Sequence, residues 1–185
     1  IGYHIQQGMR YALNKKLHRT IPVVTIVTQM VVDGDDPSFT NPTKPVGPFY
    51  TEEEARKLEA EKGYIMKEDA GRGWRRVVAS PLPKKILEIN TVRRLWDSTI
   101  VVTAGGGGTP VVVKPDGSLE GVAAVIDKDF AAELLAEDVD ADGLMILTEV
   151  EQAAIHYNTP NQQALGHITV AEAEKYIAEG HFTPG

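Results

Sequence analysis

The sequence predicts an α/β fold, in which a mostly parallel sheet is sandwiched by helices. Apolar, β-branched runs of strand length alternate along the chain with segments of helical periodicity. Four successive glycines directly follow one of these runs, at the strand end where open α/β sheets bind their ligands. A proline-rich segment without helical pattern interrupts the alternation between residues 33 and 83. These observations predict an α/β core with an inserted lobe.

The amino-acid composition is typical of a globular domain and argues against several other classes of protein. The 185 residues, 42% hydrophobic and 24% charged, suit one domain, or one domain with an inserted lobe. The net charge of −7 argues against a nucleic-acid partner. The absence of cysteine excludes disulfides and thiolate chemistry and favours a cytoplasmic location. No apolar run approaches the roughly 18 residues of a membrane span, so no membrane partner is expected.

The chain opens with a predicted helix and a predicted buried strand. Residues 1–19 carry apolar side chains at helical spacing. Residues 21–32 follow as one strand rich in valine and isoleucine. Together with residues 84–185, these elements are expected to form the core.

Residues 33–83 are expected to form a protruding lobe. Its segment 38–50 contains three prolines, which predict a stiff, non-helical loop with Lys44 at its centre. A rigid backbone around a single lysine is suited to binding an anion, although a solvated surface lysine is the more common case. Thr51 to Glu54 form a capping box that begins a short helix. Because turn-forming residues bracket the lobe, we expect it to move over the core.

The glycine run is the first candidate site in the core. Residues 84–97 predict a helix, and residues 100–104 a buried strand that ends at the glycines. Backbone N–H groups without surrounding side chains can enclose an anion. Neither GxxxxGK[ST] nor GxGxxG is present, so an anion site and a flexible connection stay equally open. The four glycines are Gly105, Gly106, Gly107 and Gly108.

A second candidate site begins at Asp127, which is a good N-cap for the helix that follows. Lys128 lies in the first turn, where the helix dipole disfavours a cation. Its place between Asp127 and Asp129 suggests that it acts on an anion, and the alternative is a surface ion pair of little energetic consequence. Further along, residues 111–122 predict a hairpin, residues 143–148 a continuous apolar strand, and Thr169 the cap of a final helix.

Five motifs together resemble the carbamate kinases of the amino acid kinase superfamily. They occur in that family's order and spacing, and the resemblance covers essentially the whole chain. The motif around Lys44 is the most specific, because other enzymes of this fold lack it. Thr109 replaces the family's usual isoleucine, and Glu149 its usual aspartate. The motifs occupy residues 39–50, 67–75, 105–110, 124–129 and 147–150.

The resemblance implies a reversible phosphoryl transfer between ATP with carbamate and ADP with carbamoyl phosphate, assisted by Mg²⁺. It also implies a cytoplasmic homodimer with a place in arginine metabolism. Such a transfer requires charge neutralisation and in-line positioning more than covalent chemistry. By motif match, Lys128 would stabilise the phosphoryl group in transit, Asp129 would orient the lysines of the site, and Lys44 would reach the carbamate or carbamoyl end.

The remaining site residues implied by the resemblance would bind the nucleotide. The four glycines and Asp127 would lie at the phosphates, and no residue is expected to be a metal ligand. The nucleoside would lie beside Thr148, Glu149, Val150 and Tyr157.

The resemblance covers the central portion of the family's sequence. Carbamate kinases begin with a strand and a phosphate-binding Gly-Gly-Asn loop, and they continue past a segment like residues 181–185 to Ser-x-x-Pro-Lys. The sequence contains no Gly-Gly-Asn, and no Ser-x-x-Pro-Lys follows residues 181–185. We therefore expect negligible turnover from these residues alone, since each lost positioning element costs about 10²-fold. Two alternatives stay open: another carboxylate kinase of this fold, acting for example on an N-acylated glutamate, and a non-catalytic nucleotide-binding fragment.

Overall fold

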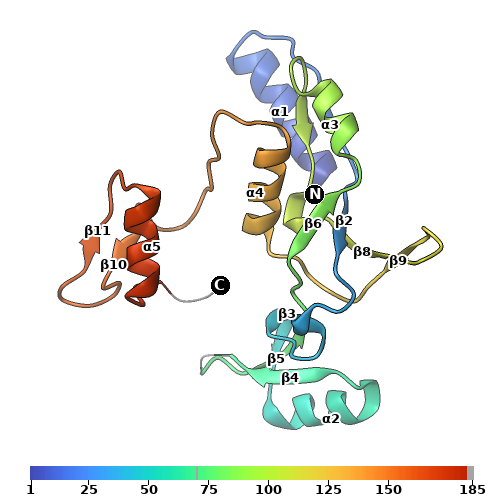
Figure 1. Cartoon of the computed structure of the whole chain (residues 1–185), viewed down its shortest axis with the longest axis vertical. Coiled ribbons are helices and arrows are strands. Elements are labelled where there is room, and N and C mark those ends of the chain that lie inside the picture. The colour runs from blue at the N-terminus through green and yellow to red at the C-terminus, as the bar shows by residue number, and fades with distance from the viewer. Residues whose placement is uncertain (70, 183–185) are drawn as a thin grey trace. The chain divides into compact units, whose positions relative to one another are not determined.

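A computed structural model describes residues 1–69 and 71–182 (Figure 1). It confirms the α/β fold class, with strands and helices mixed along the chain. The chain forms two compact units, residues 1–144 and residues 145–185. Residue 70 of the 67–75 motif and residues 183–185 of the terminal motif lie outside the described residues. No helix in the described ranges is long and apolar enough to cross a membrane.

The first unit holds two sheets that carry the core. Strands β1 and β7 form a parallel pair, and a second sheet has the order β6-β2-β8-β9. In this second sheet β2 and β8 are parallel, whereas β2–β6 and β8–β9 are antiparallel. The strands are β1 (Val23–Thr25), β2 (Gln29–Val32), β6 (Pro83–Ile86), β7 (Ile100–Val102), β8 (Thr109–Val113) and β9 (Leu119–Gly121). The helices are α1 (Gly2–Lys16), α3 (Ile89–Leu95) and α4 (Lys128–Asp138).

The single strand predicted over residues 21–32 is wrong, because the chain breaks it into β1 and β2. Val23 pairs with Ile100 of β7, whereas Met30 pairs with Pro110 of β8. The two halves therefore belong to different sheets, and residues 26–28 form the junction. This junction lies beside the end of β7, where the glycine run begins.

The helix predicted over residues 84–97 is correct only in its second half. Residues 83–86 form β6, which pairs with β2, and α3 begins at Ile89. Ile86 is fully buried in the core from the strand, although its spacing to Ile89 and Val92 also fits a helix. A short apolar run does not distinguish the two structures by periodicity. The core cluster consists of Met30, Val32, Ile86, Ile89, Val92, Ile126, Ala131 and Val139.

A three-stranded antiparallel sheet lies within the segment for which a lobe is predicted. Its order is β3-β5-β4, and α2 packs on β4 and β5. The predicted capping box is confirmed, and α2 ends at Gly63 in the left-handed conformation. The elements are β3 (Lys44–Tyr50), α2 (Glu52–Lys62), β4 (Ile65–Glu68) and β5 (Trp74–Val78), preceded by a short 3-10 turn, η1 (Pro37–Phe39). The division between this lobe and the core stays a prediction.

The stiff loop predicted over residues 38–50 is wrong in its second part, because residues 44–50 form β3. Proline removes a backbone donor, and it is tolerated in strands that lie at the edge of a sheet. β3 pairs only with β5 within the described residues, so Pro45 and Pro48 lie on such an edge. Lys44 is consequently the first residue of a strand.

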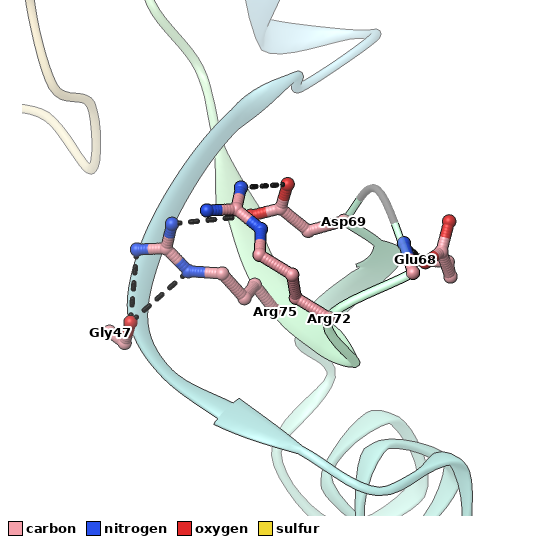
Figure 2. Close-up of polar contacts among 6 residues, drawn as sticks. Gly47, Glu68, Asp69, Arg72 and Arg75 are labelled. Atoms are coloured by element: carbon pink, nitrogen blue, oxygen red, sulfur yellow. Dashed lines mark hydrogen bonds and ion pairs between the residues drawn. The ribbon is translucent and has the colours of Figure 1, made fainter.

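Arg75 bridges a break in the β3–β5 ladder. The register shifts between Val46 and Tyr50, and Gly47 has a φ of 75°. The Arg75 guanidinium donates from Nε and Nη2 to the Gly47 carbonyl at 3.2 and 3.0 Å (Figure 2). It also contacts Asp69 at 3.4 Å, which in turn pairs with Arg72 at 2.7 Å. Arg75 thus replaces ladder hydrogen bonds that the irregular backbone cannot make.

Cations over aromatic rings supplement the small apolar core of this sheet. The five such contacts found in the described ranges all lie between residues 49 and 76, which is dense compared with about one per 70–80 residues in proteins generally. The pairs are Arg56–Trp74, Lys62–Tyr64, Arg72–Phe49, Arg75–Phe49 and Arg76–Tyr64.

We predict that Arg75→Met lowers the free energy of unfolding by about 1–2 kcal/mol, because it leaves the Gly47 carbonyl without its charged donor. Arg72→Met is the matched control, since Arg72 also contacts Asp69 and the Phe49 ring but does not bond Gly47. Urea denaturation measures both variants. An equal loss of unfolding free energy in the two variants would contradict a role for the hydrogen bonds from Arg75 to the Gly47 carbonyl.

The second unit contains a short hairpin and a helix. Strands β10 (Ala154–Ile155) and β11 (Gln163–Ala164) are antiparallel, and α5 (Val170–Ala178) follows. The predicted cap at Thr169 is confirmed, since Thr169 and Glu172 form a capping box.

The strand predicted over residues 143–148 is wrong. These residues have no regular structure, and Met145 and Leu147 are 84% and 87% exposed. A strand requires a neighbour for its N–H and C=O groups. Within the described residues, no strand pairs with this run, so its apolar sequence alone does not produce a strand.

Candidate active site

The glycine run forms a tight turn after β7. Gly105–Gly107 make a single 3-10 turn, η2, and Gly106, Gly107 and Gly108 have φ of 72°, 102° and 81°. A Cβ at residue 107 would lie 2.5 Å from the Ile126 carbonyl oxygen. Glycine is therefore required there, because the loop approaches the backbone that leads into α4.

The loop offers backbone donors to a pocket. Within the described residues, the amides of Gly105, Gly106 and Gly108 donate to no acceptor. These glycines line a pocket of about 520 Å³ that also includes the ends of β1 and β7. Clustered free N–H groups of this kind suit an anion.

Backbone pairing brings Lys44 to the start of α4. In the β3–β5 ladder Lys44 pairs with Val78. The next residue, Ala79, bridges to Ala124, and its carbonyl accepts from Val125 N at 2.9 Å. Asp127 follows three residues after Ala124, so the sheet register places Lys44 beside it.

Lys44 and Asp127 form a partly buried ion pair. Lys44 Nζ donates to Asp127 Oδ2 at 2.8 Å, and the side chains are 32% and 22% exposed. The Lys44 ammonium lowers the pKa of Asp127, and partial burial opposes this shift. Asp127 is also the predicted N-cap, because its Oδ1 accepts from Asp129 N at 2.9 Å. The structure therefore brings three predicted features together: Lys44, Asp127 and the glycine loop.

Lys128 and Asp129 contact each other on the exposed side of the first turn of α4. Lys128 Nζ lies 2.7 Å from Asp129 Oδ1, and the two side chains are 64% and 50% exposed. The hydrogen bond to Asp129 raises the pKa of Lys128. No hydrogen bond joins Lys128 to the glycine loop within the described residues.

The predicted nucleoside residues lie in the other compact unit. They belong to the second unit, are exposed and lie outside any strand or helix. Their role stays a prediction. They are Thr148, Glu149, Val150 and Tyr157.

Thr28 is not among the predicted site residues, yet its hydroxyl accepts from Ala104 N at 2.8 Å at the start of the glycine loop. No local motif marks this residue. The only sequence signal is a hydroxyl side chain at the end of an apolar run that proves to be two strands.

We predict that Asp127→Asn lowers the free energy of unfolding by roughly 1 kcal/mol at pH 7, because Asn keeps the cap acceptor but loses the ion pair. The pKa of Asp127 is lower in the folded protein than its ordinary 3.8. The pair therefore contributes fully above about pH 4, and its contribution is lost as pH falls through the folded pKa. The difference between wild type and variant should shrink below pH 4 in urea titrations. Asp97→Asn, at an exposed position, is the control, and a pH-independent difference would refute the assignment.

A comparison with protein families matches residues 51–185 to the amino acid kinase family. Carbamate kinases of Pyrococcus horikoshii and Clostridium perfringens are each 56% identical over the whole of this chain. The solved carbamate kinase of Giardia lamblia bound to AMP-PNP is 44% identical, with a TM-score of 0.87. The alignments cover all of this chain but only 59% of each of the two relatives and 58% of the solved chain. The chain thus spans somewhat under two thirds of the length of its relatives, and it belongs to the amino acid kinase family.

Proposed function

We propose that the protein containing this chain is a carbamate kinase, which transfers a phosphoryl group reversibly between ATP with carbamate and ADP with carbamoyl phosphate. The observation that carries this proposal is the contact between Lys44 Nζ and Asp127 Oδ2 at 2.8 Å. It joins the proline-rich segment to the helix start beside the glycine loop. The family match begins at residue 51, whereas the matches to named carbamate kinases also include residues 1–50. They therefore cover Lys44.

The charges around this site suit phosphoryl transfer. The free amides of the glycine loop and the N-terminal end of α4 both present partial positive charge. Lys44 and Lys128 place two ammonium groups near the same helix end, each paired with a carboxylate. Preorganised donors of this kind stabilise charge that develops in the transition state.

Each residue has a distinct role in the proposed reaction. In the direction of ATP synthesis, a β-phosphate oxygen of ADP attacks the phosphorus of carbamoyl phosphate, and carbamate leaves with the electrons of the broken P–O bond. The glycine loop holds phosphate oxygens, and Lys128 meets charge on the transferring group. Lys44 holds the carbamoyl end. Asp127 and Asp129 orient these two lysines through the bonds at 2.8 and 2.7 Å.

The described residues do not provide a metal cage. No group of three or more His, Asp or Glu side chains there could hold a metal ion, and Asp127 and Asp129 each already bond a lysine. Mg²⁺ commonly keeps several waters and binds through substrate phosphates. We propose that Mg²⁺ arrives bound to the phosphates of the nucleotide.

The remaining features rest on the family resemblance. The proposed nucleoside contacts are Thr148, Glu149, Val150 and Tyr157, all exposed and therefore accessible to a ligand. A homodimer in the cytoplasm with a role in arginine metabolism completes the proposal.

The decisive experiment measures ATP formation from ADP by the intact protein, with carbamoyl phosphate and with acyl phosphates such as an N-acyl-glutamyl phosphate. Preference for carbamoyl phosphate supports the proposal, and preference for an acyl phosphate establishes the alternative carboxylate kinase. Binding of ADP without turnover of either substrate would support a non-catalytic nucleotide-binding role.

A further inference from the structure

Thr28 is buried beside the glycine loop. It is 5% exposed, and it is the one polar residue among the buried residues that the structure describes. It lies in the junction between β1 and β2. A buried hydroxyl is unfavourable unless it is hydrogen-bonded, so the partners of Thr28 explain its presence.

The Thr28 hydroxyl uses its full hydrogen-bonding capacity. Oγ1 accepts from Ala104 N at 2.8 Å and lies 2.5 Å from Thr103 Oγ1. It donates to the Ile26 carbonyl at 3.3 Å. Since a hydroxyl has one proton and two acceptor sites, Thr103 is the donor to Thr28 in this arrangement.

The same residue holds both ends of the glycine loop. Its hydroxyl binds Ala104, which precedes Gly105, and its carbonyl accepts from the amide of Thr109, which follows Gly108, at 2.8 Å. Gly108 itself approaches so closely that a Cβ there would lie 3.2 Å from the Thr28 carbonyl oxygen.

We call the two hydrogen bonds that Thr28 accepts at the ends of the loop the clamp. The backbone conformation of Ala104 shows why the loop needs it. It has a φ of 50°, a left-handed conformation that costs a non-glycine residue roughly 1–2 kcal/mol. Strained conformations persist only where the surroundings fix them. The bond from Ala104 N to Thr28 fixes this one, and it thereby sets the direction in which the loop leaves β7.

We propose that Thr28 is a positioning residue, which holds the free amides of Gly105, Gly106 and Gly108 in their anion-binding arrangement. Thr28 acts through the loop and does not itself bond the phosphate. This assignment of the loop to phosphate rests on the proposed function, whereas the clamp rests on the hydrogen bonds of Thr28.

The test compares Thr28→Val, which removes the hydroxyl at nearly constant shape, with Thr28→Ser, which keeps it. Thr91→Val is the control for the change from threonine to valine itself, because Thr91 is exposed on α3 and does not line the pocket. In the intact protein, Thr28→Val should lower kcat about tenfold or more, as misplaced catalytic groups do. Thr28→Ser and Thr91→Val should remain near wild type.

A second readout does not require activity. Hydrogen exchange at the amides of Ala104 and Thr109, which both donate to Thr28, should become faster in Thr28→Val and stay slow in Thr28→Ser and Thr91→Val. Faster exchange in a protein that does not turn over carbamoyl phosphate would support the clamp and refute only the proposed function. Unchanged hydrogen exchange and kcat in Thr28→Val would overturn the proposed role of Thr28. An equal loss of kcat in Thr28→Val and Thr28→Ser would also overturn it.

Discussion

Replacing Lys128 with alanine is expected to lower kcat for ATP formation by about 100-fold or more, with little change in ADP affinity. The proposed contact is made with charge that develops on the phosphoryl group, so it is stronger in the transition state than in the ground state. The side chain is 64% exposed and bonds only its neighbour Asp129 in the described part of the chain. The variant should therefore unfold at the same urea concentration as the wild type, and lost activity would not reflect lost structure.

Steady-state kinetics of the intact protein measure this effect, with Lys44→Ala as the contrasting variant. Removing the Lys44 side chain is expected to raise KM for carbamoyl phosphate, because the proposed role of Lys44 is to hold this small substrate. Lys128→Arg should not restore kcat, since a planar guanidinium does not replace a compact ammonium. A Lys128→Ala variant with near-normal kcat and KM would show that Lys128 is only a surface residue.

Gly107→Ala is expected to lower the free energy of unfolding by about 3 kcal/mol or more. The new Cβ would lie 2.5 Å from the Ile126 carbonyl oxygen and 2.9 Å from the Ile126 Cβ, at a φ of 102°. Backbone strain and displacement of a core residue both contribute, since Ile126 is 1% exposed. Urea denaturation measures the loss.

Gly105→Ala is the matched control for this prediction. It lies two residues away in the same loop, a Cβ there would meet no atom within 4 Å, and its φ is not in the left-handed region. Its stability should change by less than about 1 kcal/mol. Equal losses at residues 105 and 107 would show that the loop requires glycine for flexibility and not for close approach to Ile126.

Features with a local cause could be predicted from the sequence. The capping boxes at Thr51 and Thr169 and the cap at Asp127 each depend on residues within one helical turn. The hairpin between β8 and β9 likewise follows from the turn residues between two apolar runs. These signals are short-range, and the structure confirms them.

Features that depend on pairing partners could not be predicted in the same way. Among the residues that the structure describes, no strand pairs with the apolar run of residues 143–148, whereas the proline-rich segment becomes β3 because it pairs with β5. Lys44 and Asp127 are 83 residues apart in the sequence. Their motifs marked both as candidates, but only the bridge from Ala79 to Ala124 explains why they meet.

The sheet β3-β5-β4 and the core around Met30 should respond differently to temperature. Within the described part of residues 44–78, the buried hydrophobic side chains are Ala55, Met66 and Val77. The heat-capacity increase on unfolding comes from newly exposed apolar surface, and exposed polar surface opposes it. Unfolding of this sheet therefore has a small heat-capacity change per residue. Its free energy of unfolding consequently varies less with temperature than that of the core. On cooling, when apolar burial contributes less, the sheet loses a smaller share of its stability than the core does.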